Sequence, residues 1–189
     1  MQSGRRDHLV HIARKLFYEN GFHAVGIDRI LAESGVSKTT LYKHFHSKDA
    51  LVAAALKSWA DYLKERLDRI LIERGQMPIT RLESLFVLNA RMCKEKGFNG
   101  DMFINAMSEY NDKDHIVRQT AQELKESMWA WIFEAVKEAR VAEPKIVARQ
   151  IVILYEGTVS ALQIARDTAV SDFARGQVRS LIASAKKIA

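Results

Sequence analysis

Residues 35–48 of the chain read Gly-Val-Ser-Lys-Thr-Thr-Leu-Tyr-Lys-His-Phe-His-Ser-Lys, a stretch without any acidic residue. Ser37 is well placed to cap a short helix that runs from Lys38 to about Phe45, because a serine oxygen accepts N–H groups at a helix start. Leu41 and Phe45 lie one helical turn apart, which predicts that they share a buried face. The remaining side chains of this helix then point outward, and each of them can donate a hydrogen bond or carry positive charge.

Two more helices are expected before this stretch. A first helix from about residue 5 to 20 has one continuous apolar stripe, made by Leu9, Ile12, Ala13, Leu16 and Phe17. It ends at Gly21, and a second, short helix over about 27–34 ends at Gly35, since glycine adopts the left-handed C-cap conformation without a Cβ clash. Two short helices joined through Gly-Val-Ser have the proportions of a helix-turn-helix.

The rest of the chain shows helical patterns without strands. Ser47 can cap a long fourth helix that breaks at 75–78, and the capping box from Thr80 to Glu83 predicts the start of a fifth helix that runs to about residue 96. Further helices are expected at about 101–110 and 114–140, from Pro144 to a break near 168–171, and from there to about Lys187. The sequence therefore predicts an all-α fold of about nine helices.

Bulk composition narrows the class of protein. The chain has 189 residues and a formal net charge of +6, and residues 1–56 carry half of that excess together with five of the six histidines. Such a concentrated basic segment suits a polyanionic partner. Cys93 is the only cysteine, which excludes an intrachain disulfide framework and favours a reducing compartment.

Other sequence signals bear on location and chemistry. The basic N-terminus lacks the apolar core of a signal peptide, and no apolar run approaches the roughly 20 residues that span a bilayer. We therefore expect a cytoplasmic protein. The sequence contains no phosphate loop, HExxH, CxxC or nucleophile elbow, so we expect neither an enzyme nor a bound cofactor.

The motifs of the N-terminal part also match a known pattern. The matching segments read Leu-Phe-Tyr-Glu-Asn-Gly-Phe at 16–22, Ile-Asp-Arg-Ile-Leu-Ala-Glu-Ser-Gly-Val-Ser at 27–37, Thr-Leu-Tyr-Lys-His-Phe at 40–45 and Ser-Lys at 47–48. Over about residues 9–56 the chain resembles the tetracycline-repressor (TetR) family. The resemblance implies a helix-turn-helix DNA-binding domain at 1–47 and a helical domain at 48–189 that binds an effector and forms a homodimer.

The outward face of the third helix and the resemblance together predict the residues that contact DNA. They are Lys38, Thr39, Thr40, Tyr42, Lys43, His44 and Lys48, with hydroxyls and imidazole suited to base edges and lysines to phosphates. The alternatives are that Tyr42 is half-buried and serves packing, and that Thr39 only supports the start of the helix. Members of the family often carry Thr or Ser as the cap of the second helix, whereas here the segment 24–26 reads Ala-Val-Gly. Glycine offers no hydroxyl to a phosphate. His44 and His46 form an H-x-H pair, but no further ligand lies near them in sequence, so we expect no metal site.

Aromatic and methionine side chains in the middle of the chain suit an adaptable apolar pocket, and an ordinary core equally well. The predicted effector-pocket residues are Met102, Phe103, Met107, Met128, Trp129, Phe133 and Tyr155. Four polar residues near this region could orient a ligand: Arg91, Asn105, Glu109 and His115.

Two C-terminal segments predict the dimer interface. Residues 151–165 are apolar nearly all round, which indicates burial on more than one side. The predicted interface residues are Gly157, Ala161, Ala174, Val178, Leu181 and Ala185; the alternative is that both segments pack only within the monomer.

These features combine into one functional hypothesis. The chain is expected to be a transcriptional repressor that binds a palindromic operator in double-stranded DNA as a homodimer and is released by a small-molecule effector. The alternative is an all-helical ligand-binding protein or enzyme whose helix-turn-helix contacts another protein. No membrane partner is expected.

Overall fold

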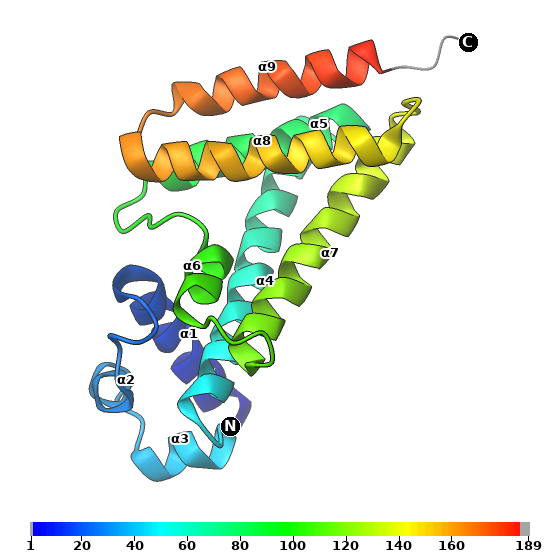
Figure 1. Ribbon diagram of the computed structural model, residues 1–189. Coiled ribbons are helices and arrows are strands. Elements are labelled where there is room, and N and C mark those ends of the chain that lie inside the picture. Colours follow the sequence, from blue (N-terminus) through cyan, green and yellow to red (C-terminus); the bar gives the residue numbers. More distant parts are fainter. Residues whose placement is uncertain (1, 186–189) are drawn as a thin grey trace. The chain divides into compact units, whose positions relative to one another are not determined.

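The computed structural model describes residues 2–185 and, within them, nine α-helices (Figure 1). Their bounds are α1 (Gln2–Asn20), α2 (Ile27–Ser34), α3 (Lys38–His44), α4 (Lys48–Arg74), α5 (Pro78–Cys93), α6 (Met102–Glu109), α7 (Ile116–Glu138), α8 (Pro144–Ala165) and α9 (Ala169–Ser184). The predicted all-α class is confirmed. The predicted end of the last helix near Lys187 lies outside the described residues.

The chain divides into two compact units, and each unit is built from two separate segments. The first unit comprises residues 1–62 and 101–125, and the second comprises residues 63–100 and 126–189. The long helices α4 and α7 therefore each contribute residues to both units. The boundary predicted at residue 47 concerns function, since it separates a DNA-binding part from an effector-binding part. The division into packed units does not test it, and it stays a prediction.

The core of the first unit forms where α1 packs against α2 and α3. Four of the five residues in the predicted apolar stripe of α1 are buried and Ile12 is half-buried; Leu9 and Ala13 are 0% exposed, and Phe17 stacks on Phe22 at 5.5 Å between ring centroids. Gly21, at φ +88°, ends α1 and donates its N–H to the carbonyl of Phe17 at 2.9 Å. The turn after α1 thus has the geometry that the sequence predicts.

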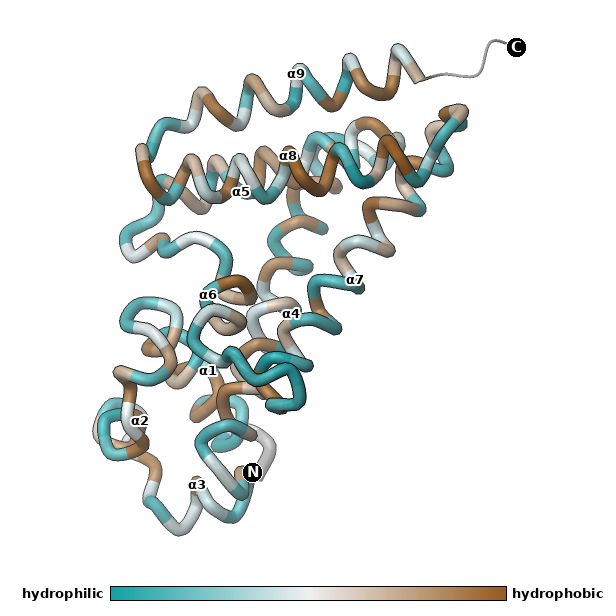
Figure 2. The backbone as a smooth tube through the Cα atoms, viewed as in Figure 1, coloured by the Kyte–Doolittle hydropathy of each residue, from teal (hydrophilic) through white to brown (hydrophobic). Residues whose placement is uncertain are grey.

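The core of the second unit forms where α5, α8 and α9 pack pairwise against one another. Its buried residues include Phe86, Ile132, Ile151, Val178 and Ile182. In Figure 1 α8 and α9 run side by side, and Figure 2 shows hydrophobic and hydrophilic residues alternating along both helices. Such alternation is typical of helices that bury one face and expose the other.

The start of α5 differs from the prediction. The capping box was expected to begin this helix at Thr80, but the helix begins at Pro78 with Met77 as N-cap. Proline suits the first helical position because its missing N–H needs no partner there. Glu83 is instead buried, and its carboxylate lies 3.3 Å from the Arg74 guanidinium and 3.1 Å from that of Arg179.

Candidate nucleic-acid interface

The turn between α2 and α3 is fixed by local hydrogen bonds. Gly35 adopts the left-handed conformation at φ +65° and donates its N–H to the Leu31 carbonyl at 2.9 Å. Ser37 accepts the backbone N–H of Thr40 at 3.2 Å, and the Ser37 and Thr40 hydroxyl oxygens lie 2.9 Å apart. The C-cap of one helix and the N-cap of the next are therefore separated by a single residue, Val36, and this sets a sharp turn.

Buried side chains fix the orientation of the two helices. Ile30 of α2 and Leu41 of α3 are both 0% exposed, and Phe45 directly after α3 is 4% exposed. The predicted burial of Leu41 and Phe45 is confirmed. Because both helices pack against α1, the opposite face of α3 is left to solvent.

The outward face of α3 presents four of the seven predicted DNA contacts as exposed side chains: Lys38, Thr39, Tyr42 and Lys43. Tyr42 exposes 43% of its surface, so it is not a core residue of the described protein. A face of two lysines, a threonine and a phenol can reach both phosphates and base edges.

The other three predicted contacts are half-buried and already engaged. The Thr40 hydroxyl takes part in the cap with Ser37. The Lys48 ammonium donates to the backbone carbonyl of His23 at 3.5 Å. His44 lies beside Phe45, with 6.5 Å between ring centroids. A contact of Thr40 or Lys48 with DNA would share or replace an existing hydrogen bond.

The segment that contains α3 carries positive charge and no acidic residue. Residues 35–48 contain no Asp or Glu, and Arg5 and Arg6 at the start of α1 are exposed. Burial, with smaller contributions from Arg14, His8 and Lys15, lowers the pKa of His11 on α1. The lowered pKa disfavours the charged form of His11, so the positive charge of this segment comes mainly from lysines and arginines.

The start of α2 has the glycine cap that the sequence indicates. Gly26 is the N-cap, in an extended conformation at φ −83° and ψ 160°, and it has no side chain to offer to a phosphate. Two loop amides before it, those of Phe22 and His23, instead donate to the carboxylate of Glu109 at 2.9 and 2.7 Å. Sequence reasoning did not assign this role to Glu109, because the partners are 86 and 87 residues apart.

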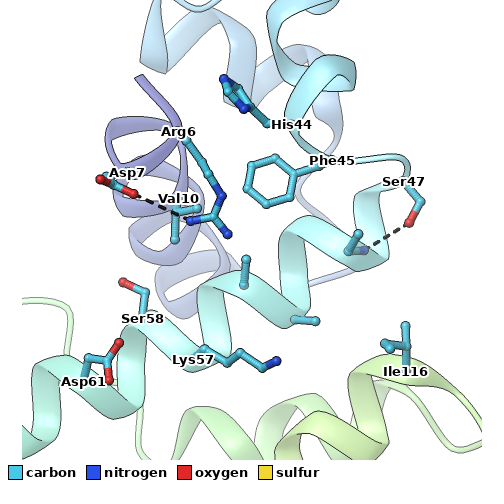
Figure 3. Close-up of a pocket in the computed structure, with 13 residues that line it drawn as sticks. Arg6, Asp7, Val10, His44, Phe45, Ser47, Lys57, Ser58, Asp61 and Ile116 are labelled. Carbon is cyan, nitrogen blue, oxygen red and sulfur yellow. Dashed lines mark hydrogen bonds and ion pairs between the residues drawn. The ribbon is translucent and has the colours of Figure 1, made fainter. Parts of the chain in front are cut away.

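A hollow of about 740 Å³ lies on the flank of the same unit (Figure 3). It is lined by residues of α1, the end of α3, α4 and the first residue of α7, Ile116. Arg6 points into it, with its guanidinium 5.2 Å from the centre of the Phe45 ring and 3.6 Å from the Asp7 carboxylate. Of the described residues that line this hollow, none is among the seven predicted for the effector pocket.

The predicted pocket residues divide between the two units. Met102 and Phe103 are buried in α6 and Met107 is half-buried, all in the first unit. In the second unit Tyr155 belongs to the core, and Met128, Trp129 and Phe133 pack against that core. The rings of Trp129 and Phe133 stack at 6.1 Å and 8°. The effector pocket stays a prediction.

The predicted dimer residues lie at different depths. Ala174 and Val178 are 1% and 0% exposed within the core of the second unit, while Leu181 and Ala185 pack against that core. Gly157 is exposed and Ala161 is half-buried.

Large apolar residues are exposed elsewhere on the same two helices: Ile146, Ile153 and Ile164 on α8, at 57%, 66% and 82%, and Phe173 on α9, at 66%. We call these four residues, together with Gly157, the α8/α9 outer face.

A helix-turn-helix with an exposed, acid-free second helix defines a DNA-binding class of protein, and comparisons with known proteins agree. Residues 9–55 match the family model described as bacterial regulatory proteins, tetR family. The whole chain superposes on the crystal structure of a TetR-family transcriptional regulator from Streptomyces coelicolor with a TM-score of 0.87 and 25% identity, over 98% of this chain and 97% of that one.

Two relatives match in the N-terminal part. The transcriptional repressor KstR2 of Mycolicibacterium smegmatis is 32% identical over 85 residues, which are 45% of this chain and 41% of that protein. The transcriptional activator FasR of the same species is 44% identical over 59 residues, which are 31% of this chain and 27% of that protein. The matches thus span less than half the length of either relative.

Residues 9–55 therefore form the N-terminal domain of the tetR family of bacterial regulatory proteins, and the chain as a whole is similar to a TetR-family transcriptional regulator. This family consists of regulators and not of enzymes. Among the described residues, no helix is both long enough and apolar enough to cross a membrane.

Proposed function

We propose that this protein regulates transcription by binding double-stranded DNA through α3. The observation that carries the proposal is the exposed face of Lys38, Thr39, Tyr42 and Lys43, set by a rigid turn and free of acidic residues. A helix of this kind fits the major groove, where hydroxyl groups read base edges and lysines contact phosphates. Thr40, His44 and Lys48 join these contacts by exchanging their present partners for DNA. Residues 1–47 are the DNA-binding part, and the protein acts in the cytoplasm.

The proposal includes a homodimer that binds a palindromic operator. Two helix-turn-helix domains reach successive major grooves only if a two-fold axis relates them at a spacing of about one helical turn of DNA. The α8/α9 outer face supports such pairing, because the spacing of Ile146, Ile153 and Ile164 places these exposed residues and Gly157 on one side of α8, and Phe173 is exposed on α9; a second copy would cover such apolar residues. Ala174 and Val178 then support this face from beneath.

The proposal also includes release by a small-molecule effector, with repression as the sense of regulation. An effector that binds residues 48–189 better in one conformation than in another shifts the population toward that conformation. The half-buried Met128, Trp129 and Phe133, which pack against the core that contains Tyr155, support an apolar ligand in the second unit. Repression follows the KstR2 relative, whereas the FasR relative is an activator.

Salt dependence of DNA binding tests the proposal. Duplexes from the region upstream of the protein's own gene and random duplexes are titrated at rising salt by fluorescence anisotropy. We expect the specific duplex to bind at least about 1,000-fold more tightly, with affinity falling steeply as salt increases. In Lys43→Ala the slope of log affinity against log salt becomes shallower by about one.

The same titration addresses the alternative, in which the helix-turn-helix contacts a protein. Equal affinity for both duplexes at moderate salt would contradict specific DNA binding and favour that alternative. The matched control is Lys137→Ala, which removes an exposed lysine of α7 that pairs with Glu134, and which leaves the salt slope unchanged.

A further inference from the structure

The loop between α1 and α2, residues 21–26, is fixed by a side chain from outside the helix-turn-helix segment. Glu109, the last residue of α6, accepts the Phe22 N–H on one carboxylate oxygen at 2.9 Å and the His23 N–H on the other at 2.7 Å. A Cβ added to Gly21 would lie 3.1 Å from the first of these oxygens. Glycine at this position therefore leaves room for the carboxylate to approach the backbone.

The His23 side chain makes a second attachment to the same end of α6. Its Nε2 lies 2.9 Å from the backbone carbonyl oxygen of Glu109, and its ring packs on Tyr110 at 4.6 Å between centroids. Tyr110 is 6% exposed and contacts His115 on another side at 4.6 Å. The loop is thus joined to the end of α6 through both its backbone and a side chain.

The end of α6 is itself anchored. Arg118 of α7 donates from one guanidinium nitrogen to the carbonyls of Met107 and Tyr110, at 2.8 and 3.3 Å. These bonds satisfy carbonyl groups that a helix end otherwise leaves without an intrahelical partner. Glu109 therefore projects from a fixed segment, and its carboxylate presents two acceptors in a set direction.

We infer that Glu109 is a positioning residue for DNA binding: by holding the 21–26 loop it sets the orientation of α2 and α3, so that operator affinity depends on the two hydrogen bonds that its carboxylate accepts. The inference rests on the proposed function. The loop leads directly into α2, and the tight turn at Gly35 transmits a shift of α2 to α3. Without the two hydrogen bonds α3 samples more orientations, and the apparent affinity falls with the fraction of molecules that remain competent to bind.

A positioning role has a signature that a loss of folded protein does not have. Two half-sites require both DNA-binding domains to be in the competent orientation at once, whereas one half-site requires only one competent domain. Loss of Glu109 should therefore weaken binding to a two-half-site duplex more than binding to a one-half-site duplex. Unfolding would reduce both equally.

The experiment compares Glu109→Gln and Glu109→Ala with the wild-type full chain. The probe is a duplex with two inverted half-sites, selected by the wild-type protein from random sequence, and a version with one half-site scrambled. Glutamine keeps one acceptor oxygen and places an amide N–H₂ against the other loop amide, so affinity for the two-half-site duplex falls about tenfold. Alanine removes both acceptors and lowers affinity further. Glu134→Gln, the same chemical change at an exposed residue of α7, leaves affinity unchanged.

Amide hydrogen exchange of Phe22 and His23 in the DNA-free protein gives the second readout, and both amides exchange faster in the Glu109 variants than in Glu134→Gln. Unchanged two-half-site affinity in a folded Glu109→Gln protein would overturn the inference, as would an equal fall on both duplexes. Should Glu109→Ala not fold, Glu109→Gln alone decides the question. A wild-type protein that selects no DNA would contradict the proposed function instead. In that case amide exchange alone still tests the role of Glu109: if Phe22 and His23 exchange as slowly in Glu109→Gln as in the wild type, Glu109 does not hold the loop.

Discussion

Tyr42 combines an apolar ring with 43% exposure in the middle of α3. A large aromatic residue at that position would ordinarily be expected in the core, but Leu41 and Phe45 already fill the inward face of this segment. A phenol in this place can pack on a thymine methyl group or on the sugar and donate its O–H to a phosphate or a base edge. The exposure of Tyr42 thus agrees with a contact role rather than a packing role.

Removal of this side chain tests that role. In Tyr42→Ala we expect operator affinity to fall about tenfold to 100-fold, since a good base or backbone contact contributes about 1–3 kcal/mol. The thermal midpoint should change by no more than a few degrees because little buried surface is lost. Anisotropy titration and thermal unfolding by circular dichroism measure the two quantities. Tyr42→Phe, which keeps the ring, is the matched control, and early unfolding of Tyr42→Ala with unchanged DNA affinity would show that the ring packs instead.

At the scale of elements, α2 and α3 could be predicted closely because their limits depend on neighbours in sequence. Gly35 and Ser37 act through partners within four residues, at Leu31 and Thr40. The start of α5 could not be predicted correctly from the capping box, because Glu83 is drawn to the distant Arg179 and Pro78 already supplies a good first residue. Pattern rules fail where a tertiary partner competes with a local one.

Tyr110, in the connection from α6 to α7, predicts how the stability of the fold depends on pH. Burial, and then the nearby charges of Asp49 and Glu109, raise the pKa of Tyr110 to about 12 from an ordinary value of 10.0. The folded state therefore favours the neutral phenol. This stabilisation is complete below pH 10.0 and is lost as pH rises toward about 12, because the unfolded chain ionises first.

Tyr110→Phe keeps the ring between His23 and His115 but cannot ionise. We expect its urea midpoint to decline less steeply than that of the wild type as pH rises above 10.0, with the two proteins compared also at neutral pH. Parallel declines of the two midpoints would show that Tyr110 contributes nothing to alkaline unfolding.

At the scale of the whole molecule, the two units carry different kinds of surface. The first presents the basic face of α3, and the second presents the apolar α8/α9 outer face. The sequence pattern identified α8 and α9 as the helices of interest, but it selected Ala174 and Val178, which are buried in the protomer. The pattern of α9 does not reveal whether its apolar residues meet the protomer's own core or a second copy, and α8 is apolar nearly all round, so the outward residues could be found only in the structure.

A charge on the outer face tests the homodimer. Ile153 is 66% exposed on α8, and Ile153→Asp should give monomers in sedimentation velocity while the helical circular dichroism spectrum is retained. A buried, unpaired carboxylate at an interface is strongly unfavourable, whereas on a free surface it is harmless. Ile72→Asp, at an 81% exposed isoleucine of α4, is the matched control and should stay dimeric. An Ile153→Asp protein that remains a dimer would move the interface to another surface.

The division of each unit into two chain segments bears on how such proteins can be recombined. A hybrid regulator made by grafting only residues 1–62 onto a different partner would leave the amides of Phe22 and His23 facing whatever residue the recipient carries in place of Glu109. A graft that includes residues 101–125 as well would carry the acceptor together with its donors. The part of this protein that can be exchanged as a unit therefore consists of two sequence segments, residues 1–62 and 101–125. A crossover placed at the end of the family motif, near residue 55, would separate them.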